Sequence, residues 1–257
     1  EKHPQDNIGA ARDVRPLVGR AARAAVLLPA ELLEIKHTLL AARVLKRDIM
    51  ATNEECEPLH AHAENLHDLP KLTKAIMRAL DERGEVLDAA SAKLADIRRE
   101  LTDTHERLLR KLERLIHNPR NAAFLQEALI MQREHRYVIP LKANFKGRIR
   151  GIVHDKSASG ATLFIEPLAT LELNNRWREL QIAELEQVKR LLRALSADVG
   201  EKAEKITDSV QALAALDLAF AQARYAEALD ATEPELVQIP VDTEAAGGSS
   251  IRMHSAR

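Results

Sequence analysis

The sequence predicts a mainly α-helical protein, with a helical core, a long antiparallel coiled-coil lever and a small inserted β-sheet clamp. Three observations lead to this fold class. Ala, Leu, Glu, Arg and Lys are abundant and aromatic residues make up only 3% of the chain, which is the composition of long helices. Two long stretches carry narrow apolar stripes at helical spacing. Between them lies a segment in which apolar and polar residues alternate.

The N-terminal part is expected to form helices of a globular core. Residues 1–28 show no regular pattern, whereas leucines and isoleucines recur at helical spacing over 29–52. Asp68 stands before Leu69-Pro70 and is expected to cap a shorter helix that has proline in its first turn. Gly84 then interrupts this helix.

Two later helices are expected to pair as the lever. Ser91 can cap the first helix, which should close at Asn118-Pro119. A narrow stripe cannot bury itself, so the economical arrangement is an antiparallel coiled coil of 94–117 against 170–199. The stripes are Leu94, Ile97, Leu101, Thr104, Leu108, Leu112 and Leu115 in the first helix and Leu185, Val188, Leu192, Leu195 and Val199 in the second.

The segment between the lever helices has the period of a β-strand. Apolar side chains alternate with others over 137–146, and 148–155 and 161–165 follow the same pattern. Ser157-Ala158-Ser159-Gly160 supplies a turn, because glycine tolerates positive φ and serine hydroxyls bond the backbone of turns. A small sheet is therefore expected at the tip of the lever.

These patterns predict an order of parts along the chain. The expected parts are a helical core part at 1–92, a lever helix at 93–118, the clamp with its small β-sheet at 119–167, the returning lever helix at 168–200, a core helix at 201–231 and a linker at 232–257 with at most a short strand at 236–241.

Charge and cysteine content limit the classes of partner and compartment. The 38 Lys and Arg residues nearly balance the 39 Asp and Glu residues, so any site for a polyanion must be local. Cys56 is the single cysteine and cannot form an internal disulfide, which fits a reducing cytoplasm. No apolar run is long enough to span a bilayer, and the charged N-terminus has no signal-peptide core. We therefore predict a cytoplasmic protein without a membrane partner.

The clamp segment concentrates positive charge. Over 133–156, seven Lys and Arg residues stand against Glu134 and Asp155, a local net charge of +5. On ideal strands Lys142 and Lys146 would share one side, and so would Arg148, Arg150, His154 and Lys156. Such a face can bind phosphates, although a solvated strand face is the alternative. The candidate nucleic-acid-binding residues are Arg136, Lys142, Lys146, Arg148, Arg150 and Lys156.

The same segment resembles a family signature. The matching stretches are 133–142, 146–155 and 157–167, continued by Leu173-Asn174-Asn175 and preceded by similar stretches at 13–17, 31–35 and 84–88. By these residues the chain resembles bacterial MutS-II proteins, the MutS branch without mismatch recognition, over nearly its whole length.

The resemblance implies an architecture and partners. Intact members of this family are homodimers with a helical core, a lever pair, a clamp, an ABC-type ATPase and a C-terminal Smr nuclease domain. This chain is expected to begin inside the core and to stop before the ATPase. The family is associated with suppression of recombination through branched DNA and with splitting of collided ribosomes. Branched or double-stranded DNA and ribosomal RNA are therefore the implied partners.

No cofactor and no catalytic residue is expected within the chain. It has no G-x-x-x-x-G-K-[ST] motif, so ATP and Mg²⁺ would belong to an ATPase domain outside it. His154-Asp155 with Ser157 and Ser159 invites a hydrolase interpretation, but neighbouring strand residues point to opposite faces, which favours a polar turn.

A metal site is a weaker alternative. His60, Glu64 and His67 would line one face of a helix at positions i, i+4 and i+7, although solvated histidines are the default. Three hypotheses therefore remain: a nucleic-acid-binding clamp and lever, a nuclease or hydrolase acting through the clamp turn, and a structural coiled-coil dimerisation spacer.

Overall fold

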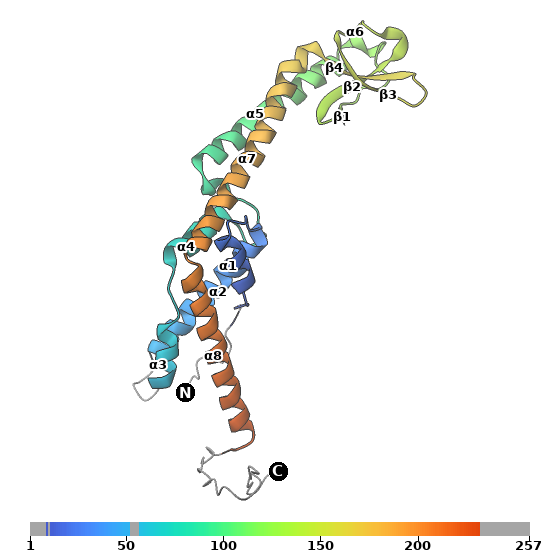
Figure 1. The fold of residues 1–257 in the computed structure, drawn as a ribbon. Coiled ribbons are helices and arrows are strands. Elements are labelled where there is room, and N and C mark those ends of the chain that lie inside the picture. The colour runs from blue at the N-terminus through green and yellow to red at the C-terminus, as the bar shows by residue number, and fades with distance from the viewer. Residues whose placement is uncertain (1–8, 10, 52–56, 232–257) are drawn as a thin grey trace, which may run out of the picture. The chain divides into compact units, whose positions relative to one another are not determined.

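A computed structural model describes residues 9, 11–51 and 57–231. It divides into two compact units, one up to Asp217 and one from Leu218 onward, and the elements discussed below lie in the first unit apart from the end of the last helix. The predicted fold class is confirmed, since the first unit combines helices with one small antiparallel sheet (Figure 1). No helix within the described ranges is both long and apolar enough to cross a membrane.

The core is built from short helices packed against the ends of the two longest ones. Its buried side chains include Leu32, Ile35, Ile76, Leu94 and Val199, from four different helices. The helix expected from Pro29 is confirmed. The helices are α1 (Arg15–Ala22), α2 (Pro29–Met50), α3 (Glu57–Glu64), α4 (Pro70–Ala79), α5 (Ala92–Ile116), α6 (Pro119–Ala122), α7 (Leu171–Glu201) and α8 (Ala203–Ala228).

Two expectations for the N-terminal part are wrong. The stretch expected to be irregular contains α1, whose eight residues are too few for a stable helix in isolation. Tertiary packing stabilises it: Ala21 is buried, and its carbonyl oxygen lies 2.6 Å from where a Cβ would stand at Gly200. Asp68 does not cap α4, because Leu69 holds that position, and Asp68 instead lies 3.6 Å from Arg43.

Helices α5 and α7 run antiparallel and side by side, and we call this pair the lever (Figure 1). The predicted cap is confirmed, since Ser91 Oγ accepts a hydrogen bond from the Leu94 amide at 3.3 Å. The predicted stripe of α5 is largely confirmed, because Leu94, Thr104, Leu108 and Leu112 are all buried.

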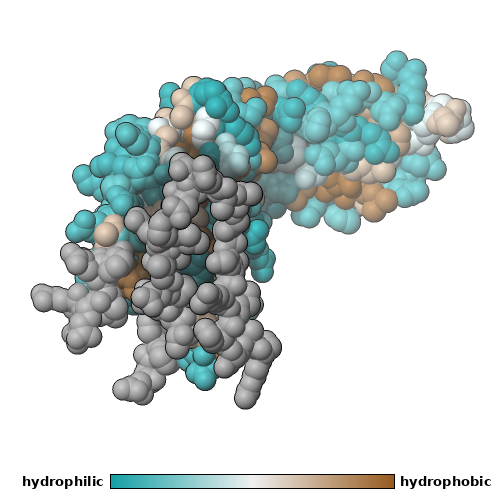
Figure 2. Space-filling view, turned by 60° about the horizontal axis from the view of Figure 1, so that its bottom comes forward, coloured by the Kyte–Doolittle hydropathy of each residue, from teal (hydrophilic) through white to brown (hydrophobic). Residues whose placement is uncertain are grey.

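The stripe predicted for α7 is partly wrong. Leu195 and Val199 are buried as predicted, and Val188 and Leu192 pack against the same core, whereas Leu185 is 59% exposed and Gln187 is buried near it. Polar side chains fill the seam here, with Glu184 accepting a hydrogen bond from Arg98 at 2.7 Å and Gln187 donating to Ser91 at 3.2 Å. Apolar spacing therefore identifies the core-facing side of α7 but fails at Leu185, where polar side chains fill the seam. In the view of Figure 2, apolar patches lie among the hydrophilic residues.

The sheet lies at the opposite end of the lever from α1, α2 and α4 (Figure 1). Its order is β1-β2-β4-β3, and all neighbours are antiparallel. One face packs on the end of α5, where Leu108 and Leu112 meet Ile139 and Ile165 in a second core. The strands are β1 (Met131–Arg133), β2 (Arg136–Lys142), β3 (Gly151–Lys156) and β4 (Thr162–Pro167).

The strand boundaries differ from those predicted. Strand β2 ends at Lys142 and a 3-10 turn at Ala143–Phe145 follows, so Lys146 lies on a connection and does not share a strand face with Lys142. Strand β3 starts at Gly151, which places Arg148 and Arg150 on the same connection. The residues from Val138 to Leu141 are all buried, because β2 is a central strand covered on both faces.

Some expectations fall outside the described residues. They are the role of Cys56, the linker at 232–257 and the short strand at 236–241.

Replacing Leu108 by Asp should destabilise the protein strongly. Its side chain is fully buried between the lever and the sheet, so the substitution removes a buried side chain and places an unpaired charge there. We expect a loss of about 3–5 kcal/mol in the free energy of unfolding, measured by urea denaturation.

The matched control is Leu185→Asp, on the exposed side of α7. This variant should unfold within about 0.5 kcal/mol of the parent, as surface substitutions do. Equal losses of unfolding free energy in the two variants would contradict the observed burial of Leu108 and exposure of Leu185.

Candidate nucleic-acid interface

Four cations are exposed on β3 and on the connection that precedes it. They are Lys146, Arg148, Arg150 and Lys156. Within the described residues none of them forms an ion pair, and Arg148 makes only a distant contact with the Phe124 ring, 6.0 Å from its centroid. The nearest carboxylate in sequence, Asp155, lies 3.3 Å from Arg133. These four charges are therefore open to an external anion.

Two other candidates hold the sheet and its connections, the region at 119–167 that we call the clamp, as in the prediction. Lys142 is half-buried, and its ammonium donates a hydrogen bond to the Ala123 carbonyl at 3.3 Å. Arg136 donates to both carboxylate oxygens of Glu166, at 2.9 and 3.1 Å, and to Asn175 at 2.8 Å. The structure thus separates the six predicted residues into four open cations and two engaged ones.

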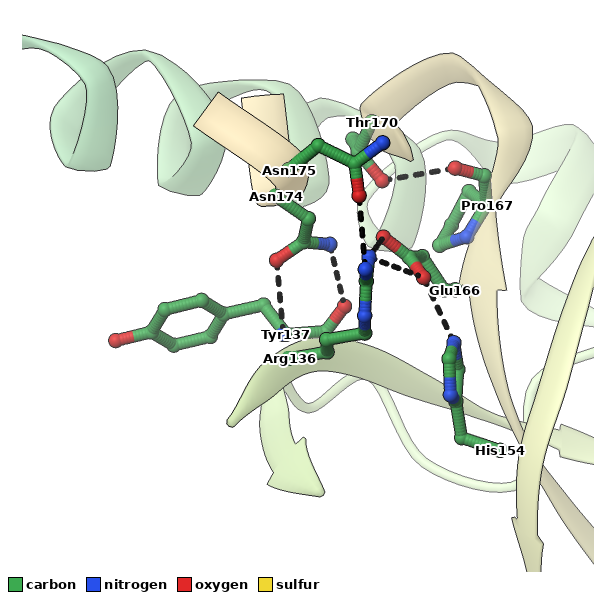
Figure 3. Close-up of polar contacts among 8 residues, drawn as sticks. All are labelled: Arg136, Tyr137, His154, Glu166, Pro167, Thr170, Asn174 and Asn175. Carbon is green, nitrogen blue, oxygen red and sulfur yellow. Dashed lines mark hydrogen bonds and ion pairs between the residues drawn. The ribbon is translucent and has the colours of Figure 1, made fainter. Parts of the chain in front are cut away.

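Glu166 is the centre of a buried polar network (Figure 3). Its side chain is 0% exposed and also contacts His154 Nε2 at 2.7 Å. A buried carboxylate is costly unless it is paired and hydrogen-bonded. Here Arg136 from β2 and His154 from β3 satisfy it, so the network ties three neighbouring strands together.

Asn174 joins the lever to the sheet in place of a strand residue. Its amide accepts from the Tyr137 N–H at 3.0 Å and donates to the Tyr137 carbonyl at 3.1 Å. Extending the β2–β4 register places Pro167 opposite Tyr137, and proline has no N–H to donate. The side chain of Asn174 supplies the missing donor and acceptor, as Figure 3 shows.

An aromatic cluster closes the same junction. His105 Nε2 lies 2.7 Å from the Tyr137 hydroxyl, and its ring stacks on Trp177 with centroids 5.5 Å apart. Tyr137 and Trp177 are 5.0 Å apart between centroids. Burial raises the pKa of Tyr137, so its hydroxyl remains protonated at neutral pH. The junction therefore joins α5, α7 and β2.

The residues of the hydrolase hypothesis are not brought together. His154 is held by Glu166, while Ser157 Oγ accepts from the Thr162 amide at 3.0 Å. Ser159 Oγ accepts from the Ala161 amide at 3.4 Å. Among the residues that the structure describes, no serine contacts His154. The predicted polar turn that bonds its own backbone is confirmed.

The residues of the metal hypothesis are also separated. Helix α3 ends at Glu64, so His67 does not share its face and instead lies 3.7 Å from Asp208. His60 Nε2 contacts the Ile49 carbonyl at 3.1 Å. The described ranges contain no group of three or more His, Cys, Asp or Glu side chains placed to hold a metal ion.

Sequence reasoning assigned no role to Glu166, Asn174, His105 or Trp177. Glu166 and Asn174 stand within the stretches that carry the family resemblance. A carboxylate between apolar strand residues is the signal that could have identified Glu166, because such a group requires buried partners.

Comparisons with known proteins give a consistent group of relatives, although no protein-family model matches the chain. The "Endonuclease MutS2" of Thermomicrobium roseum is 46% identical over 240 residues, which cover 92% of this chain and 30% of the relative. That of Geobacillus sp. (strain WCH70) is 44% identical, with 88% and 29% covered. That of Pelotomaculum thermopropionicum is 41% identical, with 91% and 30% covered. The chain thus spans about 30% of the length of these relatives.

Replacing Glu166 by Ala should loosen the sheet. Arg136 and His154 would lose their shared partner. Removing one partner of a buried ion pair lowers the free energy of unfolding by about 3–5 kcal/mol. Amide hydrogen exchange in β3 and β4 should accelerate, while exchange in α1 and α2 stays as in the parent.

The control is Glu134→Ala, an exposed position between β1 and β2. It should leave exchange in β3 unchanged. Parental protection of β3 in the Glu166 variant would show that the network does not hold the sheet.

Proposed function

We propose a function for this chain from the premise that it belongs to the MutS2 family. The sheet and the connection before β3 form a clamp that binds the phosphate backbone of nucleic acid, and α5 and α7 form a lever that links this clamp to the helical core. The observation that carries the proposal is the group of four open cations, Lys146, Arg148, Arg150 and Lys156.

Electrostatics favours backbone contacts over reading of bases. The clamp is locally positive in a chain of net charge −1, and phosphate contacts dominate the affinity of such surfaces. Its aromatic rings are engaged elsewhere: Tyr137 lies in the junction, and Phe124 packs on Phe145 with centroids 5.2 Å apart. A stacking platform for single strands is therefore not supported.

The proposed partners are branched or double-stranded DNA and ribosomal RNA. The relatives' name, endonuclease, concerns an activity on nucleic acid. In the longer protein we expect the lever to transmit motion between the clamp and an ATPase that binds ATP and Mg²⁺, within a homodimer. We place the protein in the cytoplasm, where the thiol of Cys56 would stay reduced.

We assign no catalytic residue to this chain. A hydrolase acting through the clamp turn would need His154 beside a serine, and its position against Glu166 does not favour this. A purely structural spacer would not need open cations at the clamp. If this chain showed no affinity for nucleic acid even at low salt, the spacer alternative would be favoured.

Single Ala variants of Lys146, Arg148, Arg150 and Lys156 should weaken binding to a branched DNA and to ribosomes. Each lost phosphate contact should flatten the slope of log affinity against log salt by roughly one unit. Binding should weaken similarly across DNA sequences, because backbone contacts carry no sequence information. Fluorescence anisotropy with labelled DNA across a salt series measures both quantities.

Two controls separate binding from folding. Arg110→Ala removes an exposed lever cation that already pairs with Glu106 at 3.4 Å, and should keep the parental slope. Lys142→Ala should lower the melting temperature, because this ammonium bonds the Ala123 carbonyl. A folded variant without all four open cations that retains the parental slope on both ligands would exclude the clamp as the binding site.

A further inference from the structure

A second basic surface lies where the lever meets the helical core. Two adjacent grooves, of about 460 and 470 Å³, flank α4, the start of α5 and the second half of α7. We call them together the lever-base groove. Seven cations and two carboxylates, Glu186 and Asp198, line it, for a local net charge of +5. The cations are Lys71, Lys74 and Arg78 in one groove and Lys93, Lys189, Arg190 and Arg193 in the other.

These cations are left open, unlike others on the same helices. In the part of the chain that the structure describes, only Arg78 has a side-chain hydrogen bond, to the Ala89 carbonyl at 3.0 Å. The other six form no ion pair with any described residue. By contrast, Arg98 and Arg176 of the lever are bound to carboxylates at 2.7 and 2.6 Å. Like charges held close together without partners repel one another, which favours a surface that binds an anion.

The start of α5 strengthens this positive field. Ala90, just before the helix, lines one groove, and Lys93, in its first turn, lines the other. The helix has 25 residues, so its N-terminus carries the partial positive charge of a full helix dipole. An anion in either groove would therefore meet side-chain charge and helix dipole together.

The two grooves border α7 on successive turns. Arg190 lines one groove and Ala194, one helical turn later on α7, lines the other, with Arg193 directly beside it in sequence. The cations are thus spread over two grooves and three helices and do not converge on a single point. A row of phosphates fits this distribution better than one phosphate or one nucleotide does.

The lining also indicates which nucleic acid fits. It contains no aromatic side chain and consists otherwise of Ala, Leu and Gln, so unpaired bases would find nothing to stack on. We propose that the lever-base groove binds the phosphate backbone of double-stranded DNA. This site is separate from the clamp and does not require that the clamp bind DNA.

The test uses the full chain and a fluorescent 40-base-pair DNA duplex. The variant Lys189→Ala/Arg190→Ala/Arg193→Ala should bind at least tenfold more weakly at fixed salt, and its salt slope should fall by roughly two to three units, about 0.9 per lost contact. All three side chains are exposed, so the fold should persist, as circular dichroism can verify.

The matched control removes the same charge elsewhere on the lever. Arg99→Ala/Arg110→Ala/Lys111→Ala changes three exposed residues of α5 that do not line the groove. It should retain nearly the parental salt slope. Equal losses in the two triple variants would mean that net charge, and not a site, controls binding, and would overturn the proposal.

Lysine acetylation followed by mass spectrometry locates the duplex directly. Bound duplex should protect Lys93 and Lys189 from acetylation, whether or not Lys146 and Lys156 of the clamp are also protected. Protection confined to the clamp lysines would overturn the lever-base site and leave the proposed function standing. Protection confined to the lever-base lysines would support the lever-base site and contradict DNA binding by the clamp.

Two competitors check the ligand class. A single-stranded oligonucleotide of the same length should protect Lys93 and Lys189 less than the duplex does. Inorganic phosphate at millimolar concentration should not displace the duplex, since it offers one contact in place of a row. Displacement by phosphate, or equal protection by the single strand, would contradict the assignment to duplex DNA.

Discussion

The arrangement of the sheet depends on the buried carboxylate of Glu166 being paired. Its oxygens accept hydrogen bonds from Arg136 and lie in contact with His154. Arg136 also donates a hydrogen bond to Asn175 at the start of α7. A charge in this position is tolerable only with both partners present. The network therefore fixes how β2, β3 and β4 lie together and how the sheet meets the lever. Asn174 adds two backbone hydrogen bonds at the same junction.

This constraint explains why the basic residues of the clamp divide into two groups. One group is Arg133, Arg136 and Lys142. Their side chains bond to Asp155, Glu166 and the Ala123 carbonyl and so stabilise the clamp. The cations of the connection before β3 and of the end of β3 have no such partners among the described residues. A sequence window of high positive charge thus contains both cations that bond within the protein and cations that are open to solvent. Only the contacts in the structure distinguish the two.

Helices and strands could be predicted from the sequence where a local pattern, such as a cap or an apolar stripe, determines them. Ser91 and the leucines of α5 define that helix locally, so its start and stripe are confirmed. Leu185 shows the limit, because polar residues occupy part of the real seam of α7 and an apolar pattern cannot reveal them. Helix α1 shows another limit, since its stability comes from contacts with α7 that lie far away in the chain. The open cations were within the predicted set, whereas the lever-base groove was missed because its residues come from three separate segments.

Helix α7 joins the sheet to the helical core as one continuous element. Helix α7 has 31 residues, and at 1.5 Å per residue it is roughly 46 Å long. No proline interrupts it, and its one glycine, Gly200, lies at its end, where it packs closely against α1. At the sheet end, Asn174 and Trp177 join the same helix to β2. Because packed interiors deform little, a displacement of the sheet would move α7 as one body and would be felt where Gly200 meets Ala21. The exposed cations beside β3 and the lever-base groove therefore lie on parts joined by α7, so a duplex bound at either site, as proposed, would act on the other through this helix.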